Sequence, residues 1–228
     1  MNKKSFIALS SMVVLAILSG CGQKKDVDKI AEAQSCLDAS TAATAVACME
    51  KVDGLSTEAS YLIRCSAMFV QEGFSNPTKL AQAVNNMRGT GASSSASVMS
   101  VLAFSYAGTD QTTNYANATA ASNYCSLSGS KGLIMLATIS KLASAANYVN
   151  SANCGGAGDM TAALTCLKNN STAVSSDLGT VMITTYQASC ATVNDSNKLF
   201  CDQFSTAITN AGGTSNPSAV ANAFLNQF

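Results

Sequence analysis

LIMLATISKLASAANYV, residues 133–149, is the stretch that decides the fold class of this chain. Its apolar residues recur at the 3.6-residue period of a helix, and Lys141 is the charged residue that interrupts them. A helix needs about 20 predominantly apolar residues to cross a bilayer. We therefore expect a buried or amphipathic core helix here, rather than a membrane span.

Helical patterns continue outward from this stretch to both ends of the chain. Asn76 and Asn216 each precede a proline, which is favoured at the first helical position because its missing N–H has no intrahelical partner there. The β-branched run at 181–185 favours a strand by itself, but its context favours a helix. The predicted helices begin at Val27 and at Ser40 or Thr41, and continue as 56–72, 76–87, 98–104, 115–125, 133–149, 159–167, 178–186, 194–212 and 216–228.

The best linker lies at Arg88–Ala96, RGTGASSSA, because glycine and serine there interrupt both helical and strand periodicity. A second loop is expected over Thr109–Asn114. The resulting organisation has a helical unit at 27–87, a linker with connecting helices at 88–132, and a second helical unit at 133–228.

The two units have the marks of an internal duplication. SNPTKLAQAVNNM, residues 75–87, and SNPSAVANAFLNQF, residues 215–228, share the order Ser-Asn-Pro-hydroxyl followed by Ala-x-Ala. Cys36 and Cys48 stand at the same spacing as Cys154 and Cys166 (48 − 36 = 166 − 154). We therefore expect two copies of one helical unit, the second with an inserted helix that holds Cys190.

Eight cysteines follow Cys21, and an even number in an exported chain is typical of disulfides. The repeated spacing predicts that Cys36 pairs with Cys48 and Cys154 with Cys166. Three pairings remain open for the other four cysteines. No Cys-x-x-Cys pair and no histidine occurs in the sequence, so we expect no metal site and no cofactor. The disulfide candidates are Cys36, Cys48, Cys65, Cys125, Cys154, Cys166, Cys190 and Cys201.

The first 21 residues have the order of a bacterial secretory signal, with Lys3 and Lys4 before an apolar run from residue 6 to residue 18. Leu-Ser-Gly-Cys at 18–21 resembles the lipobox of bacterial lipoproteins. That resemblance implies cleavage after residue 20, a diacylglyceryl thioether on Cys21, and a short tether over 21–26. An ordinary secretory signal, with Cys21 as a plain thiol, is the alternative. Gly22 replaces the aspartate of the family's inner-membrane retention signal, which favours the outer membrane in a cell with two membranes.

Charge excludes one class of partner. Without residues 1–20 the chain keeps 13 − 2 = 11 basic side chains against 13 acidic ones, so its net charge is about −2. Nucleic-acid binding proteins carry basic surfaces that neutralise phosphates, and this composition offers none. We expect no nucleic acid partner.

Few residues are candidates for catalysis. The absence of histidine excludes Ser-His-Asp and Cys-His mechanisms. Ser128 and Lys131 have the Ser-x-x-Lys spacing that resembles that of penicillin-recognising enzymes, but the companion Ser-Asp-Asn and Lys-Thr-Gly motifs are missing. Glu50 and Asp53 share a helix face that we interpret as solvated, and Gly155–Asp159, GGAGD, is interpreted as an inter-helix turn. We assign no catalytic residue.

These observations predict an all-α protein of disulfide-clipped helical hairpins, arranged as a small solenoid-like array or an irregular bundle. It is expected to be exported and held on a membrane through acyl chains on Cys21, and to bind another envelope protein or a peptide. We do not expect an enzyme. The alternatives are an envelope hydrolase that uses Ser128 with Lys131, or carboxylates alone, and a small-molecule carrier with an apolar cavity between the two units.

Overall fold

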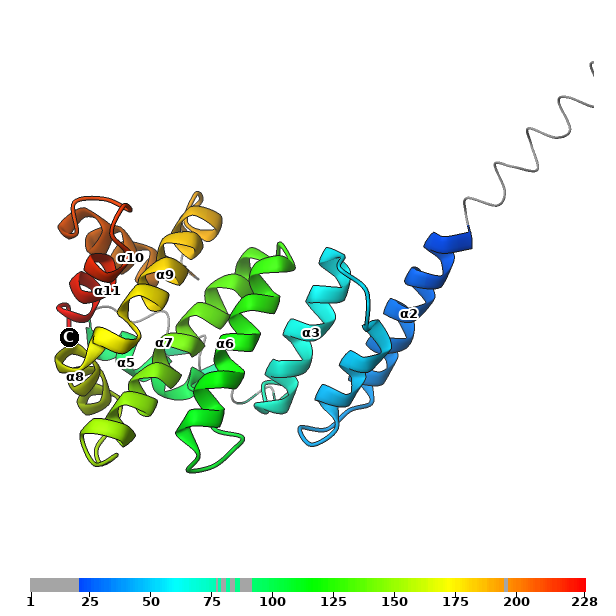
Figure 1. Ribbon diagram of the computed structural model, residues 1–228, viewed down its shortest axis with the longest axis horizontal. Helices are drawn as coiled ribbons and strands as arrows, with labels where there is room; N and C mark the ends of the chain where they lie inside the picture. Colours follow the sequence, from blue (N-terminus) through cyan, green and yellow to red (C-terminus); the bar gives the residue numbers. More distant parts are fainter. Residues whose placement is uncertain (1–20, 77, 79–80, 83–84, 87–91, 195–196) are drawn as a thin grey trace, which may run out of the picture.

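The computed structural model of the protein (Figure 1) describes all residues except 1–20, 77, 79–80, 83–84, 87–91 and 195–196. Within this described part, the regular secondary structure is helical and no strand occurs, which confirms the all-α prediction. The helices are α2 (Cys21–Asp38), the 3₁₀-helix η1 (Ala45–Val52), α3 (Glu58–Gln71), α5 (Ala92–Leu102), α6 (Gln111–Leu127), α7 (Lys131–Asn153), α8 (Met160–Asn169), the 3₁₀-helix η2 (Ser171–Ala173), α9 (Ser175–Ser189), α10 (Lys198–Asn210) and α11 (Pro217–Leu225).

The helices form an elongated array. Figure 1 shows α2, α3, α6 and α7 side by side, and each of them packs on the next. Helices α5, α8, α9, α10 and α11 gather at the far end, around and beyond α7. We call α2, η1 and α3 the N-terminal region, and α5 with α7–α11 the C-terminal body. Helix α6 lies between them and packs on both α3 and α7.

The N-terminal region has a small aliphatic core of its own. Arg64 of α3 fastens the end of η1, because its guanidinium donates hydrogen bonds to the carbonyl oxygens of Val52 at 2.7 Å and Leu55 at 3.0 Å. Helix α3 itself begins with a capping box, in which Thr57 and Ser60 exchange side-chain and backbone hydrogen bonds. The buried core consists of Ala33, Leu37, Ala45, Cys48, Val52, Ile63 and Ala67.

The C-terminal body contains the main core, which is larger and richer in aromatic side chains. Phe200, Phe204 and Phe224 are almost completely buried, and their rings pack at centroid distances of 6.2 and 5.5 Å. Close helix packing also uses small residues. A Cβ at Gly179 of α9 would overlap the backbone carbonyl of Pro217, so α11 can begin against α9 only because residue 179 is glycine.

Helix α7 is the central element, as the sequence predicts. By length and composition it is apolar enough to cross a membrane, but 72% of its most apolar window is buried inside the protein. Lys141 is among these buried residues and is only 1% exposed. The prediction of a core helix is therefore confirmed, and the helix is longer than the predicted 133–149 by a few residues at each end.

Four disulfides join the helices. Both predicted pairs form, Cys36–Cys48 between α2 and η1 and Cys154–Cys166 between the end of α7 and α8. The cysteines that the sequence left open pair as Cys65–Cys125, from α3 to α6, and Cys190–Cys201, from the end of α9 to α10.

The Cys65–Cys125 bridge is fully buried and ties the N-terminal region to α6. The carboxylate of Glu72 provides a second link between the N-terminal region and the rest of the array. Glu72, at the end of α3, accepts hydrogen bonds from the amides of Ser105 at 2.7 Å and Tyr106 at 3.1 Å, which follow α5. The Cys65–Cys125 disulfide and the Glu72 hydrogen bonds thus attach α3 to α6 and to the segment that follows α5.

The prediction of two irregular segments is partly wrong, because each contains helical residues. Ala92–Ala96, predicted as linker, belongs to α5, because the burial of Val98, Met99 and Leu102 makes the preceding Ser-rich turn part of a packed helix. The predicted loop at 109–114 ends at Asp110, whose carboxylate caps α6, so residues 111–114 are helical. Linker residues 88–91, and much of the predicted helix 76–87, lie outside the described residues.

Two other boundaries also differ. Helix α2 already includes residues 21–26, ahead of the predicted start at Val27, so the predicted tether is helical and rises by only about 1.5 Å per residue. Helix α5 ends at Leu102, and Phe104 leaves the helix so that its amide can donate to the buried Ser144 hydroxyl at 2.9 Å. The β-branched run at 181–185 is helical within α9, as predicted from its context.

Candidate functional site

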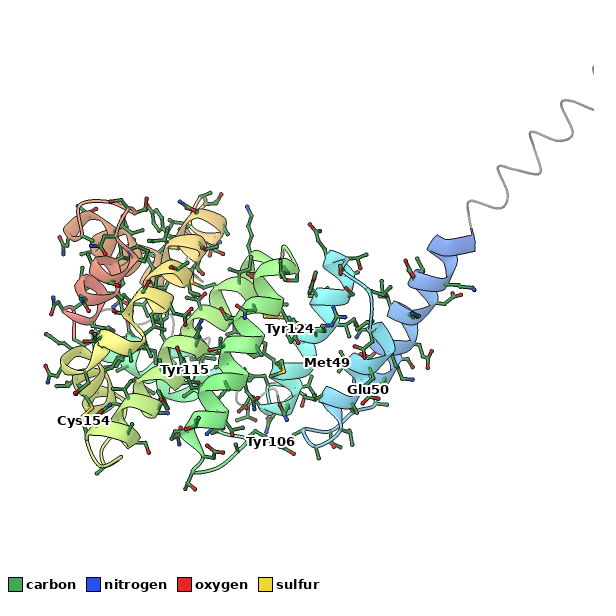
Figure 2. All side chains as sticks on the ribbon, in the orientation of Figure 1. Met49, Glu50, Tyr106, Tyr115, Tyr124 and Cys154 are labelled. Carbon is green, nitrogen blue, oxygen red and sulfur yellow. A yellow bond between two sulfur atoms is a disulfide. The ribbon has the colours of Figure 1, made fainter. Side chains whose placement is uncertain are left out.

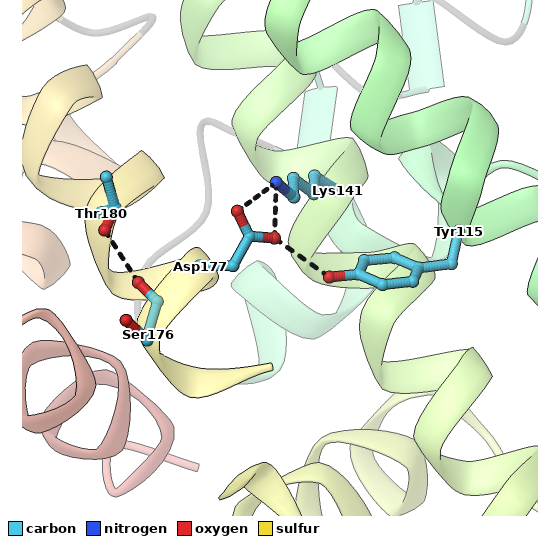
Figure 3. Close-up of polar contacts among 5 residues, drawn as sticks. All are labelled: Tyr115, Lys141, Ser176, Asp177 and Thr180. Carbon is cyan, nitrogen blue, oxygen red and sulfur yellow. Dashed lines mark hydrogen bonds and ion pairs between the residues drawn. The ribbon is translucent and has the colours of Figure 1, made fainter. Parts of the chain in front are cut away.

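A buried ion pair lies where α7 meets the start of α9 (Figure 3). The Lys141 ammonium contacts both carboxylate oxygens of Asp177, at 2.8 Å and 2.7 Å. Lys141 is 1% exposed, whereas the Asp177 side chain is 50% exposed. A buried ammonium is stable only when it is paired, so Asp177 is the group that allows a lysine inside this core.

The position of Asp177 follows from local structure. It lies in the first turn of α9, where the helix dipole favours a negative side chain. The same turn is held by the Thr180 hydroxyl, which donates to the Ser176 carbonyl oxygen at 2.8 Å. Leu178, the next residue, is fully buried and fixes the rotation of α9, which leaves Asp177 facing α7 at the protein surface.

Tyr115 of α6 joins this ion pair from the other side. Its hydroxyl donates a hydrogen bond to Asp177 at 3.2 Å. Burial of the phenol and the negative charge of Asp177 together raise the pKa of Tyr115 well above its ordinary value of 10.0. The tyrosine is therefore a neutral hydrogen-bond donor at physiological pH, and three helices meet through the Lys141, Asp177 and Tyr115 side chains.

Tyr148 of α7 stacks on Tyr115. The two rings are nearly parallel, with an interplanar angle of 14° and a centroid distance of 5.4 Å. Tyr148 is also one of the residues that line a cavity of about 200 Å³ between the start of α6 and the end of α7. We call this cavity the tyrosine pocket. It is lined by Thr109, Asp110, Gln111, Thr112, Tyr148, Ser151 and Ala152.

The polar rim of the tyrosine pocket is fixed by helix capping. Asp110 accepts hydrogen bonds from the Thr113 amide at 3.0 Å and the Thr113 hydroxyl at 2.6 Å. These bonds to Thr113 lower the pKa of Asp110 below its ordinary value, so its carboxylate is ionised at neutral pH. The lining residues thus comprise hydroxyls, an amide, a carboxylate and one aromatic ring, with no basic side chain among them.

The structure does not form the candidate Ser-Lys dyad. Ser128 caps the end of α6, where its hydroxyl donates to the Cys125 carbonyl oxygen at 2.7 Å and accepts from the Ser130 amide. Lys131 is the exposed first residue of α7, and no hydrogen bond joins it to Ser128. Both residues therefore have structural explanations in the α6–α7 turn.

The other sequence candidates occupy separate parts of the molecule. Figure 2 places Glu50 in the N-terminal region and Cys154 at the far end of the C-terminal body. Glu50 is exposed on η1, and its neighbour Lys51 pairs with Glu32 of α2 instead. Residues 155–159 form the turn between α7 and α8, as interpreted from the sequence, and Asp159 caps α8 through the Ala162 amide.

Metal ligands do not cluster in the described part of the chain. No group of three or more histidine, cysteine, aspartate or glutamate side chains there is arranged to hold an ion. The prediction that the protein has no metal or cofactor is not tested by this observation. Cys21, the predicted lipidation site, stands at the first position of α2.

Sequence reasoning missed Asp177, Tyr115 and Tyr148. One signal was available, because a lysine in the middle of an apolar helix requires a carboxylate partner. The partner itself was not recognisable, since Asp177 follows Lys141 by 36 positions and several other acidic residues were equally available. Comparisons of the chain with protein-family models, with curated proteins and with solved structures find no match.

Proposed function

We propose that this chain is an exported, lipid-anchored protein of a bacterial cell envelope that binds another envelope protein or a peptide. The main observation that supports export is the disulfide pattern. Four disulfides use all eight cysteines after Cys21, and such bridges persist in oxidising compartments.

The same pattern favours Cys21 as the acylated residue. The chain has nine cysteines, and the eight after Cys21 pair with one another in four disulfides. Cys21 lies in α2, the first described helix of the N-terminal region, so an anchor at this residue would lie close to that region. Two or three acyl chains would hold the protein on the membrane permanently.

A binding role is favoured over catalysis because two polar residues that could act in catalysis serve structural purposes instead. Ser128 caps a helix, and Asp177 neutralises a buried lysine. Exposed large apolar side chains, which are common at protein contacts, include three in the N-terminal region next to the proposed anchor. These three are Val27, Val46 and Leu62.

We also propose that the array arose by duplication. Cys36–Cys48 and Cys154–Cys166 have the same separation of 12, and each joins the end of a long helix to the following element. The two Ser-Asn-Pro segments differ in detail. Asn76 accepts from the Thr78 amide, whereas Asn216 accepts from the Ala219 amide one residue further along. The other two disulfides also differ, since Cys65 pairs outside 27–87 while Cys201 pairs within 133–228.

Membrane fractionation of the Cys21→Ser variant tests the anchor. We expect the variant to leave the membrane fraction and lose labelling by radioactive palmitate, with an unchanged far-ultraviolet circular dichroism spectrum. Cys21→Ala is a second variant with the same expectation. Sedimentation of either variant with carbonate-washed membranes would contradict the lipid anchor.

Photo-crosslinking in living cells tests the binding role. A photoreactive amino acid is placed at Leu62, which is 39% exposed, and at Lys168, an exposed residue of α8 in the C-terminal body, as the control. We expect a discrete adduct from the Leu62 position that is identified by mass spectrometry as an envelope protein. Equal adducts from both positions, or none from Leu62, would count against a partner at the N-terminal region.

A further inference from the structure

The tyrosine pocket has the features of a prepared binding site. Rotation of the Tyr148 ring is restricted by its stacking contact with Tyr115. Tyr115 is held in turn by its hydrogen bond to Asp177, and Asp177 by the buried ammonium of Lys141. This series of contacts fixes the aromatic wall of the pocket before any ligand arrives, which lowers the entropic cost of binding.

The size of the pocket restricts what it accommodates. Its volume is about 200 Å³, below the 300–1,000 Å³ or so of pockets that enclose a drug-sized molecule. One small ring, or one unit of a longer chain, fits such a space. The pocket is open to solvent at the junction of α6 and α7, so the rest of a longer ligand can extend away from the surface.

The lining chemistry restricts the ligand further. Thr109, Thr112 and Ser151 present hydroxyls that both donate and accept hydrogen bonds. Tyr148 supplies the aromatic ring among the lining residues, and the face of such a ring attracts C–H groups. The Asp110 carboxylate repels anions, and no basic side chain lines the pocket. A ligand with many hydroxyls, an apolar C–H face and no negative charge matches these groups.

We propose that the tyrosine pocket binds one residue of a neutral carbohydrate, with the sugar's C–H face on Tyr148 and its hydroxyls on Thr109, Thr112 and Ser151. This ligand class goes beyond the proposed protein or peptide partner. It depends neither on the anchor at Cys21 nor on the N-terminal region, because the pocket lies between α6 and α7.

Nuclear magnetic resonance on the purified full-length protein tests the proposal. The probes are neutral methyl glycosides of glucose, galactose, mannose and N-acetylglucosamine, together with their neutral disaccharides. The protein is kept in a zwitterionic detergent, since detergents with sugar head groups would compete. We expect binding of at least one probe with a dissociation constant on the order of 1 mM, typical of a small open site, and shifts of the amide signals of residues 109–112 and 151.

Substitutions at two pocket positions, Ala152 and Tyr148, test whether the probes bind in the tyrosine pocket. Ala152→Trp fills the cavity from an exposed position and should abolish binding, whereas Ala47→Trp adds the same side chain to an exposed position of η1 and should leave binding unchanged. Tyr148→Ala should weaken binding by about tenfold, and Tyr148→Phe, which keeps the ring, should restore most of it.

Three results would overturn the proposal. They are the absence of binding by every neutral probe at about 10 mM, which exceeds the expected dissociation constant, undiminished binding by Ala152→Trp, and tighter binding of peptides or acidic sugars than of neutral ones. None of these results bears on the anchor or the envelope partner, because the Cys21→Ser and Leu62 experiments measure different properties.

Discussion

The N-terminal region and the C-terminal body are built from similar short helices, each with a disulfide of the same separation, yet they bury different side chains. The core of the N-terminal region consists of alanine, leucine, valine, isoleucine and cysteine residues. The core of the C-terminal body adds phenylalanines, methionines and a paired lysine. Burial of apolar area contributes about 25 cal/mol per Å², so the region with small side chains gains much less from packing.

This difference explains how the two regions are connected. Small units that bury little surface usually need covalent links, and the N-terminal region has one within itself and one to α6. The Cys65–Cys125 bridge and the Glu72 hydrogen bonds attach it to the rest of the array. We infer that the C-terminal body is stable without these attachments, whereas the N-terminal region depends on them.

The largest expected effect tests this dependence. Replacing Cys65 and Cys125 by serine opens a loop with a sequence separation of 60, which is worth about 4 kcal/mol in the chain-entropy model. We expect the N-terminal region to unfold in a separate transition at lower temperature, which scanning calorimetry measures. The matched control is Cys36→Ser with Cys48→Ser, whose separation of 12 predicts a loss of about 3 kcal/mol. A single transition in both variants would contradict the comparison.

The second prediction concerns the C-terminal body alone. Gly179→Ala places a methyl group onto the backbone of Pro217, and backbone cannot move aside as a flexible side chain does. We expect a loss of about 3 kcal/mol in urea unfolding, at the upper end of overpacking effects. Gly132→Ala is the control, because its Cβ meets nothing within 4 Å, and it should be neutral or slightly stabilising. Equal behaviour of the two variants would show that α9 and α11 do not approach closely.

The third prediction separates the two partners of the buried ion pair. Asp177→Ala leaves the Lys141 ammonium buried without a carboxylate, and we expect a loss of about 2 kcal/mol, reduced from that of an enclosed pair by the 50% exposure of Asp177. Lys141→Met removes the buried charge and leaves an aspartate that water can solvate. Its expected cost is below about 1 kcal/mol. A larger loss from Lys141→Met than from Asp177→Ala in urea unfolding would contradict this explanation.

The smallest expected effect concerns the pH dependence of folding stability. Because the pKa of Tyr115 is raised above 10.0, the folded protein keeps this proton at pH values where the unfolded chain releases it. Stability should therefore decline as the pH rises above about 10, the ordinary tyrosine value, and the decline should be shallower in Tyr115→Phe. Ultraviolet titration of the folded protein checks the raised pKa, because Tyr115→Phe should remove absorbance that develops above the ordinary tyrosine pKa of 10.0.

Much of the local structure could be predicted from the sequence. The helix at 133–149, the turn at 155–159 and the Asn-Pro start of α11 follow from periodicity and from the conformations that glycine and proline favour. The repeated cysteine spacing predicted two disulfides correctly. The start of α5 was misplaced because burial of Val98 and Met99 decides it, and no local signal in the Ser-rich segment reports that burial.

The sequence by itself determined the helical class, the two disulfides at the repeated spacing and the need of a buried lysine for a negative partner, because each of these depends on residues near one another or on a single residue's chemistry. The tertiary structure alone decided that Cys65 joins Cys125, that Asp177 pairs with Lys141, and that Tyr115 stacks on Tyr148. These contacts join different helices, and which faces of the helices meet depends on how all the side chains pack together. The periodicity of one helix does not indicate which face of another helix it contacts.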